Sequence, residues 1–201
     1  QETGKWHALV DFINTQVGTL ADDEVDQKVA LLFQLIEIYQ SNERIPSEDM
    51  VTKTYRRIMD LSPTNVDALD SLAEKYEGKK RWRDLIQVLQ QRIEVTEDAL
   101  ELLDLFLQVS DLWIERMSNP SQAIPFLERI LELDRENMAV VKKLREIYRA
   151  KHNIEKLYET YERELSLEHK PESRKRVLIE LAGLAQNRLH DPSRAIRYWE
   201  Q

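Results

Sequence analysis

Apolar residues recur along almost the whole chain at the spacing of an amphipathic helix. In residues 66–76, four apolar side chains stand at i, i+3, i+4 and i+7, namely Leu69, Leu72, Ala73 and Tyr76. Residues 82–93 place five more on one face: Trp82, Leu85, Ile86, Leu89 and Ile93. Neither helix could bury its stripe alone, so the pattern predicts helical hairpins that stack on neighbouring hairpins.

The stripes, and the helix-ending residues between them, predict helices at 5–17, 23–41, 48–61, 65–78, 81–95, 98–117, 120–134, 137–151, 154–167, 172–189 and 192–201. Asn119 and Asp191 are residue types that cap helices, and each is followed by a proline at the first helical position. Pro125 stands about six residues into its predicted helix, where it should remove one hydrogen bond and kink the helix. Residues 42–46 form a longer turn, which we expect to bulge outward.

The chain nearly repeats itself every 72 residues. Residues 119–124 read Asn-Pro-Ser-Gln-Ala-Ile, and residues 191–196 read Asp-Pro-Ser-Arg-Ala-Ile. Residues 57–61 and 129–133 match in the same phase, as Arg-Ile-Met-Asp-Leu and Arg-Ile-Leu-Glu-Leu. A fixed period of this length is typical of a repeat array rather than of a domain with one central core.

The hairpins resemble tetratricopeptide repeats. The large, small and aromatic positions of that family's first helix are matched at Leu69, Leu72, Ala73 and Tyr76, at Phe106, Val109, Ser110 and Trp113, and at Val141, Leu144 and Tyr148. Those of the second helix are matched at Ala123, Leu127 and Ile130. The resemblance covers essentially the whole chain. It implies an all-α fold, an α-solenoid of antiparallel helix hairpins in a right-handed superhelix.

Departures from the family pattern alternate along the chain. The second-helix alanine is present at Ala123 and Ala195 and becomes Val51, whereas the intervening hairpins carry Leu9, Leu85 and Leu157. The repeating unit is therefore a pair of unlike hairpins, and the added bulk predicts alternating spacing between helices. Arg145 and Ile36 stand where the family has a small residue.

We expect one array over residues 1–201, with a partial repeat at 1–20, repeats at about 23–63, 64–97, 98–136 and 137–170, and a partial repeat at 171–201. The sequence starts at Gln1 and its outer hairpins are incomplete, so we expect it to be a piece of a longer array. The incomplete end should expose Ile196, Tyr198 and Trp199, through which copies could associate.

In the resembled family, the first helix of each hairpin lines a concave groove that binds peptides. Carried over by position, the binding residues would be Phe33, Glu37, Asp67, Asp70, Glu74, Glu77, Asp104, Leu107, Asp111, Ile114, Lys142, Glu146 and Arg149. Four of these, Asp67, Asp70, Glu74 and Glu77, are unpaired like charges on one helix face, which repel each other. They predict an acidic groove for a basic or amphipathic partner, with Phe33, Leu107 and Ile114 as apolar anchors. The alternative is an ordinary solvated face of an acidic protein.

Composition excludes several other functions. A formal net charge of −8 argues against general binding to nucleic acids. Trp82 within the basic residues 79–83 belongs to packing, because Trp6 stands in the same phase. No apolar run reaches the ~18 residues of a membrane span, so we expect no membrane insertion. With no cysteine and four scattered histidines we expect no metal site, no cofactor and no catalysis. The compartment stays open, with the cytoplasm favoured over the periplasm or secretion.

Two functions fit these observations. The first is a non-catalytic scaffold that binds a basic or amphipathic peptide or protein in the acidic groove. The alternative is a structural spacer or self-assembly segment without a dedicated ligand groove.

Overall fold

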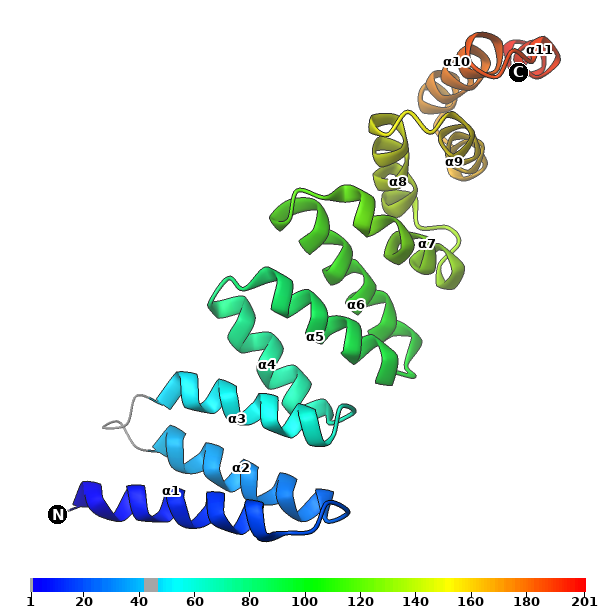
Figure 1. The fold of residues 1–201 in the computed structure, drawn as a ribbon. Coiled ribbons are helices and arrows are strands. Elements are labelled where there is room, and N and C mark those ends of the chain that lie inside the picture. The colour runs from blue at the N-terminus through cyan, green and yellow to red at the C-terminus, as the bar shows by residue number, and fades with distance from the viewer. Residues whose placement is uncertain (1, 42–46) are drawn as a thin grey trace. The chain divides into compact units, whose positions relative to one another are not determined.

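The computed structural model describes residues 2–41 and 47–201, and this part of the chain is helical, without a strand (Figure 1). Its helices are α1 (Glu2–Thr19), α2 (Val25–Ser41), α3 (Ser47–Leu61), α4 (Val66–Gly78), α5 (Trp82–Val95), α6 (Ala99–Asp111), α7 (Ile124–Leu133), α8 (Met138–Ala150), α9 (Ile154–Leu167), α10 (Pro171–Asn187) and α11 (Pro192–Trp199). A π-helical turn, η1 (Leu112–Arg116), and a 3-10 turn, η2 (Pro120–Ala123), lie between α6 and α7. The predicted all-α fold is confirmed, and each predicted helix has its counterpart. The turn at residues 42–46 lies outside the described residues.

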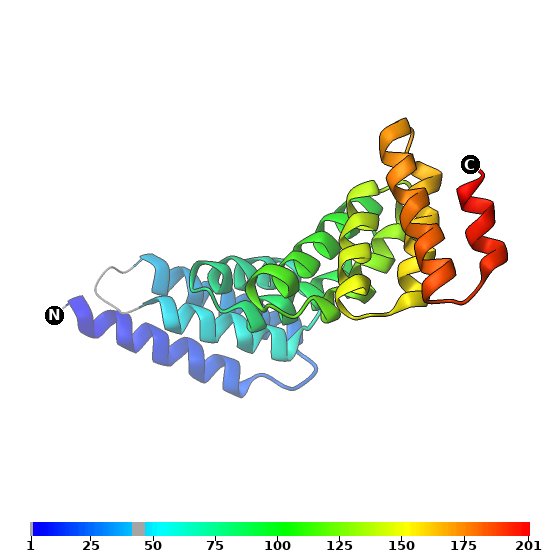
Figure 2. The same ribbon diagram turned by 90° about the horizontal axis from the view of Figure 1, so that it is seen from above.

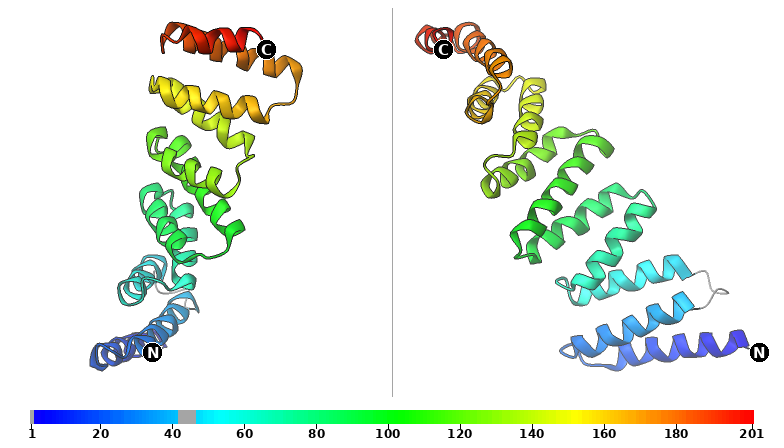
Figure 3. Two further views of the ribbon diagram at one scale, coloured as in Figure 1. Left: turned by 90° about the vertical axis from the view of Figure 1, so that its right-hand side faces the viewer. Right: turned by 180° about the vertical axis from the view of Figure 1, so that it is seen from behind.

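The chain forms two compact units, residues 1–97 with α1 to α5 and residues 98–201 with α6 to α11. The repeat borders within the units stay predictions. Within each unit, consecutive helices pack against one another as antiparallel neighbours (Figure 3). The α10–α11 hairpin of the second unit is seen side-on in Figure 2. The handedness and spacing of the array stay predictions.

The predicted apolar stripes form the two cores. In the first unit, Leu69, Leu72 and Tyr76 of α4 are buried against α3 and α5. In the second unit, Val141, Leu144 and Tyr148 of α8 are buried between α7 and α9. Burial of a large apolar side chain contributes about 1.5–3 kcal/mol. Stacking of α4 and of α8 between two second helices therefore supplies stability that a lone hairpin lacks.

Five of the six alternating second-helix positions are buried. Val51, Ala123 and Ala195 occupy the small position, and Leu85 and Leu157 occupy the large one. Leu9 is the exception, with 40% of its surface exposed. The pattern of unlike hairpins thus corresponds to real core positions.

The segment between α6 and α7 departs from prediction. The amide of Met117 donates to the carbonyl of Leu112 at 3.0 Å, an i→i+5 bond that ends the predicted helix 98–117 as a π-helical turn. The following turn is 3-10, and α7 begins only at Ile124. Pro125 is therefore the second residue of an α-helix, where its missing N–H removes no intrahelical bond. The predicted interior kink is wrong.

The turns between the two helices of a hairpin share a backbone feature. Lys80, Ser118, His152 and His190 all adopt positive φ, from 50° to 55°, and they form two pairs 72 residues apart. A residue in this left-handed conformation ends a helix by turning the chain back, a role that glycine usually fills. Asp191 then caps α11 by accepting a hydrogen bond from the amide of Arg194 at 3.0 Å. Asn119, the other predicted cap, makes no such side-chain bond.

Candidate functional site

The predicted binding residues lie on the first helices of the hairpins and on η1, at exposed or half-buried positions that we call the first-helix face. In the first unit, Phe33 and Glu37 are on α2, and Asp67, Asp70, Glu74 and Glu77 are on α4. In the second unit, α6 carries Asp104, Leu107 and Asp111, η1 carries Ile114, and α8 carries Lys142, Glu146 and Arg149.

The four carboxylates on α4 are all exposed, but they are not all unpaired. Asp70 accepts a hydrogen bond from Nε of Arg92, on the neighbouring helix α5, at 3.0 Å. This pair corrects the expectation of four unpaired charges, and its cause is tertiary, since Arg92 reaches across from the second helix of the hairpin. Asp67, Glu74 and Glu77 form no ion pair with any described residue.

In the second unit, most charged members of the set have partners within the protein. Asp111 pairs with Lys143, and Glu146 accepts hydrogen bonds from Arg145 and Arg149. Asp104 accepts a hydrogen bond from the side-chain amide of Gln108 at 2.7 Å. The α8 part of the first-helix face is thus a mixed-charge surface, unlike the acidic surface of α4.

The three predicted apolar anchors are partly buried. Phe33 packs edge-to-face on Tyr55 of α3, with ring centroids 6.3 Å apart. Leu107 and Ile114 are likewise half-buried. Each anchor therefore contributes to packing within its unit and leaves only part of its surface for a partner.

Arg145, which replaces a small residue of the family pattern, reaches across to α9. One of its guanidinium nitrogens donates to both carboxylate oxygens of Glu164, each at 2.7 Å, and the other donates to Glu146. Glu164 is almost fully buried. Burial disfavours the charge on Arg145, but these hydrogen bonds outweigh it and raise its pKa. Position 145 accommodates an arginine because the buried carboxylate of Glu164 accepts its hydrogen bonds.

Two pockets occupy equivalent places in the two units. The α3–α5 pocket, of about 420 Å³, is lined by Arg56, Met59, Asp60, Leu72, Tyr76, Arg81, Asp84, Gln87, Val88 and Gln91. The α7–α9 pocket, of about 290 Å³, is lined by Glu128, Leu131, Glu132, Leu144, Tyr148, Lys156, Glu159, Thr160 and Arg163. Every residue of the second set stands 72 positions after a residue of the first. The pockets are therefore a repeated feature of the unlike hairpin pair.

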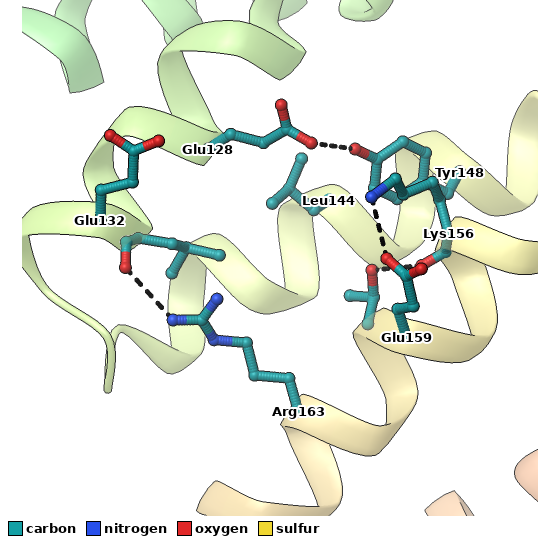
Figure 4. Close-up of a pocket in the computed structure, with 9 residues that line it drawn as sticks. Glu128, Glu132, Leu144, Tyr148, Lys156, Glu159 and Arg163 are labelled. Atoms are coloured by element: carbon teal, nitrogen blue, oxygen red, sulfur yellow. Dashed lines mark hydrogen bonds and ion pairs between the residues drawn. The ribbon is translucent and has the colours of Figure 1, made fainter.

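The charges at equivalent positions of these pockets are reversed. Arg56 of the first pocket lies 3.7 Å from Asp84, whereas the second pocket has Glu128 and Lys156 in their places. Tyr76 accepts a hydrogen bond from Arg56, but Tyr148 donates one to Glu128 at 2.8 Å. Figure 4 shows this carboxylate and hydroxyl facing each other across the α7–α9 pocket. Burial and the adjacent Glu128 raise the pKa of Tyr148.

None of the predicted site residues lines either pocket. The sequence does indicate that the charged residues of these pockets differ between the two repeats. At positions 72 residues apart, Arg56 corresponds to Glu128 and Asp84 corresponds to Lys156. Only the packing of three helices shows that these positions surround one space.

The C-terminal hairpin carries exposed apolar residues. Ile196 and Trp199 are 56% and 57% exposed, as predicted, and Trp199 lines a space of about 580 Å³ with Leu178 and Ile179. Tyr198, also predicted to be exposed, is buried instead. Its hydroxyl donates to Glu162 of α9 at 2.7 Å and lies 3.0 Å from that of Tyr158.

The described residues contain no group of histidines and carboxylates arranged to hold a metal ion. No helix in this part of the chain has the length and apolar character needed to cross a membrane.

No family model and no curated protein matches the chain. Solved structures similar to it include YrrB, described as a TPR protein with an unusual peptide-binding site, at 10% identity and a TM-score of 0.44, covering 90% of this chain and 91% of that one. PilF of Pseudomonas aeruginosa matches at 17% identity and a TM-score of 0.40, covering 96% and 90%. MamA of Desulfovibrio magneticus matches at 12% identity and a TM-score of 0.41, covering 86% and 91%. The description of YrrB names the family that this sequence resembles.

Proposed function

We propose that this chain is a non-catalytic interaction scaffold that binds a basic or amphipathic peptide or protein on its first-helix face. The observation that supports this most directly is on α4, where Asp67, Glu74 and Glu77 are exposed and form no ion pair within the described residues.

The acidic side chains of α4 are closely spaced along one helix. Glu74 and Glu77 are three residues apart on one helix, so their carboxylates repel each other at modest cost. A cationic partner would neutralise both at once and would gain in association rate from the acidic surface. Glu37 on α2 adds a further exposed carboxylate in the same unit, and the half-buried ring of Phe33 adds apolar surface beside it.

Charge reversal tests this proposal. A triple variant, Asp67→Lys, Glu74→Lys and Glu77→Lys, should lose most of its affinity for a lysine-rich amphipathic peptide in a fluorescence anisotropy titration. Added salt should weaken binding of the unaltered chain, because exposed charges are screened within about 10 Å at 0.1 M.

The matched control reverses three exposed glutamates outside the set, Glu94→Lys, Glu97→Lys and Glu136→Lys, with the same change in net charge. Equal loss of binding in both variants would mean that only net charge matters. Binding that survives both the α4 reversal and high salt would rule out the first-helix face.

A structural spacer or self-assembly segment is the second candidate, favoured by the exposed Ile196 and Trp199 at the C-terminal hairpin. Light scattering over a concentration series should then show association that Ile196→Ser and Trp199→Ser remove. A monomer at all concentrations would leave this candidate without support.

A further inference from the structure

Arginine guanidinium groups lie over several tyrosine rings of this chain. Arg56 and Arg81 lie 5.4 Å and 5.1 Å from the ring centroid of Tyr76. Arg145 and Arg149 flank Tyr161 in the same way, and Arg194 lies over Tyr158. The negative face of an aromatic ring attracts a planar cation at this distance, so these pairs are favourable cation–π contacts.

Tyr148 is the counterpart of Tyr76, 72 residues later, but it lacks both arginines. Glu128 stands in the place of Arg56, and Asn153 stands in the place of Arg81. Among the described residues, no guanidinium lies over the ring of Tyr148. The α7–α9 pocket lies beside this ring. The first unit therefore places arginines over Tyr76, whereas the second unit places none over the equivalent Tyr148.

The α7–α9 pocket has the groups that an arginine side chain needs. The Glu128 carboxylate, held by the Tyr148 hydroxyl at 2.8 Å, can accept hydrogen bonds from a guanidinium. Leu131 and Leu144 offer apolar surface for the aliphatic stem. At about 290 Å³, the space is large enough for one long side chain.

Glu128 is the one carboxylate of this pocket lining that forms no ion pair with a described residue. Of the other two, Glu132 is paired with Arg129 of α7. Lys156 is paired with Glu159 at 2.9 Å. Arg163 donates to the backbone carbonyls of Leu131 and Arg135, so its guanidinium is held on the pocket wall (Figure 4).

We propose that the α7–α9 pocket binds an arginine side chain presented by an extended segment of a partner protein. The guanidinium pairs with Glu128 beside Tyr148, as Arg56 lies beside Tyr76 and pairs with Asp84 inside the first unit. The site shares no residue with the proposed first-helix face, so the two proposals can fail separately. The α3–α5 pocket, whose own arginines already cover its tyrosine, does not bind this ligand.

A titration of the isotopically labelled chain tests the proposal by NMR. The probe is the peptide Ac-Gly-Ser-Gly-Arg-Gly-Ser-NH₂, and its counterpart carries citrulline, which has nearly the same shape without the charge. The arginine peptide should shift the amide signals of Glu128, Leu144 and Tyr148, and the citrulline peptide should bind far more weakly. Glu128→Gln should weaken arginine binding about tenfold, as expected for one charge-assisted hydrogen bond.

Three variants make the test specific. Glu136→Gln removes one exposed carboxylate outside the pocket and should leave binding unchanged. Glu128→Arg installs the residue of the first unit and should abolish binding, while Arg56→Ala should not alter it. Equal binding of the arginine and citrulline peptides, or equal weakening by Glu128→Gln and Glu136→Gln, would overturn the proposal. Signal shifts confined to α4 would assign the arginine to the first-helix face instead.

Discussion

Arg145 on α8 donates to both carboxylate oxygens of Glu164 on α9 at 2.7 Å, and this pair joins the two helices of a hairpin. Glu164 is almost fully buried, so removing its partner leaves a carboxylate without a counter-charge in the protein interior. Losing one member of a buried pair typically costs about 3–5 kcal/mol. The Arg145 side chain is 21% exposed, so water can partly replace it.

Arg145→Ala should therefore lower the free energy of unfolding by about 3 kcal/mol, the lower end of that range. Urea denaturation followed by circular dichroism measures the loss. The double variant Arg145→Met, Glu164→Leu should recover most of it, since two apolar side chains can replace the pair. A double variant no more stable than Arg145→Ala would show that the ion pair is not the cause.

The residues with positive φ offer a second prediction. His152→Gly should raise the free energy of unfolding by about 0.5–1 kcal/mol, because glycine adopts the left-handed conformation without the steric cost of a Cβ atom. Its neighbour Lys151 has a φ of −80°, so Lys151→Gly should stabilise nothing. Urea midpoints of the two variants make the comparison, and equal shifts would argue against relief of backbone strain.

Alkaline pH should destabilise the C-terminal hairpin. Burial, together with the hydrogen bonds to Tyr158 and Glu162, raises the pKa of Tyr198. The folded protein thus holds this proton more tightly than the unfolded chain, whose tyrosines titrate near pH 10. The contribution of protonated Tyr198 to the free energy of unfolding is complete below about pH 10. It is lost as the pH rises through the pKa of Tyr198 in the folded protein.

Tyr198→Phe removes this titration. At neutral pH the variant should be about 1 kcal/mol less stable, since one hydrogen-bonding hydroxyl is lost. Above about pH 10 its stability should fall less steeply than that of the unaltered chain. Parallel curves of stability against pH would exclude Tyr198 as the responsible group.

Asp49 gives a test at acid pH. The hydrogen bond and the charge of Lys79 lower the pKa of this exposed carboxyl. The contribution of ionised Asp49 to stability is present above the pKa of an aspartate in the unfolded chain, about 3.9. It is lost as the pH falls through the lower pKa of Asp49 in the folded protein. Carboxyl carbon NMR should show Asp49 titrating below a free aspartate, and Lys79→Gln should return it to the ordinary range. An unchanged titration in that variant would contradict the contact.

The helix pattern could be predicted from the sequence because each helix is a local structure. The periodicity of Leu69, Leu72 and Tyr76 identified the buried face of α4, and the same spacing identified Asp67, Glu74 and Glu77 as exposed. The cap at Asp191 was also predictable, because the bond it accepts comes from a residue three positions away. The place of Pro125 at the start of α7 could not be predicted in this way, because that start depends on the π-helical turn before it.

The ion pairs near the candidate sites depend on tertiary packing. Asp70 finds Arg92, and Arg145 finds Glu164, in each case across the packed pair of helices in one hairpin. The sequence contains both members of each pair but nothing in its periodicity says which side chains meet.

By itself, then, the sequence determined that this protein is a series of helical hairpins with buried and exposed faces, because backbone hydrogen bonding and apolar spacing act within a few residues. Tertiary structure alone decided which charges neutralise each other and where a pocket stays open. Those outcomes depend on the distance between side chains of different helices, as with Glu128 and Tyr148, which packing brings within 2.8 Å.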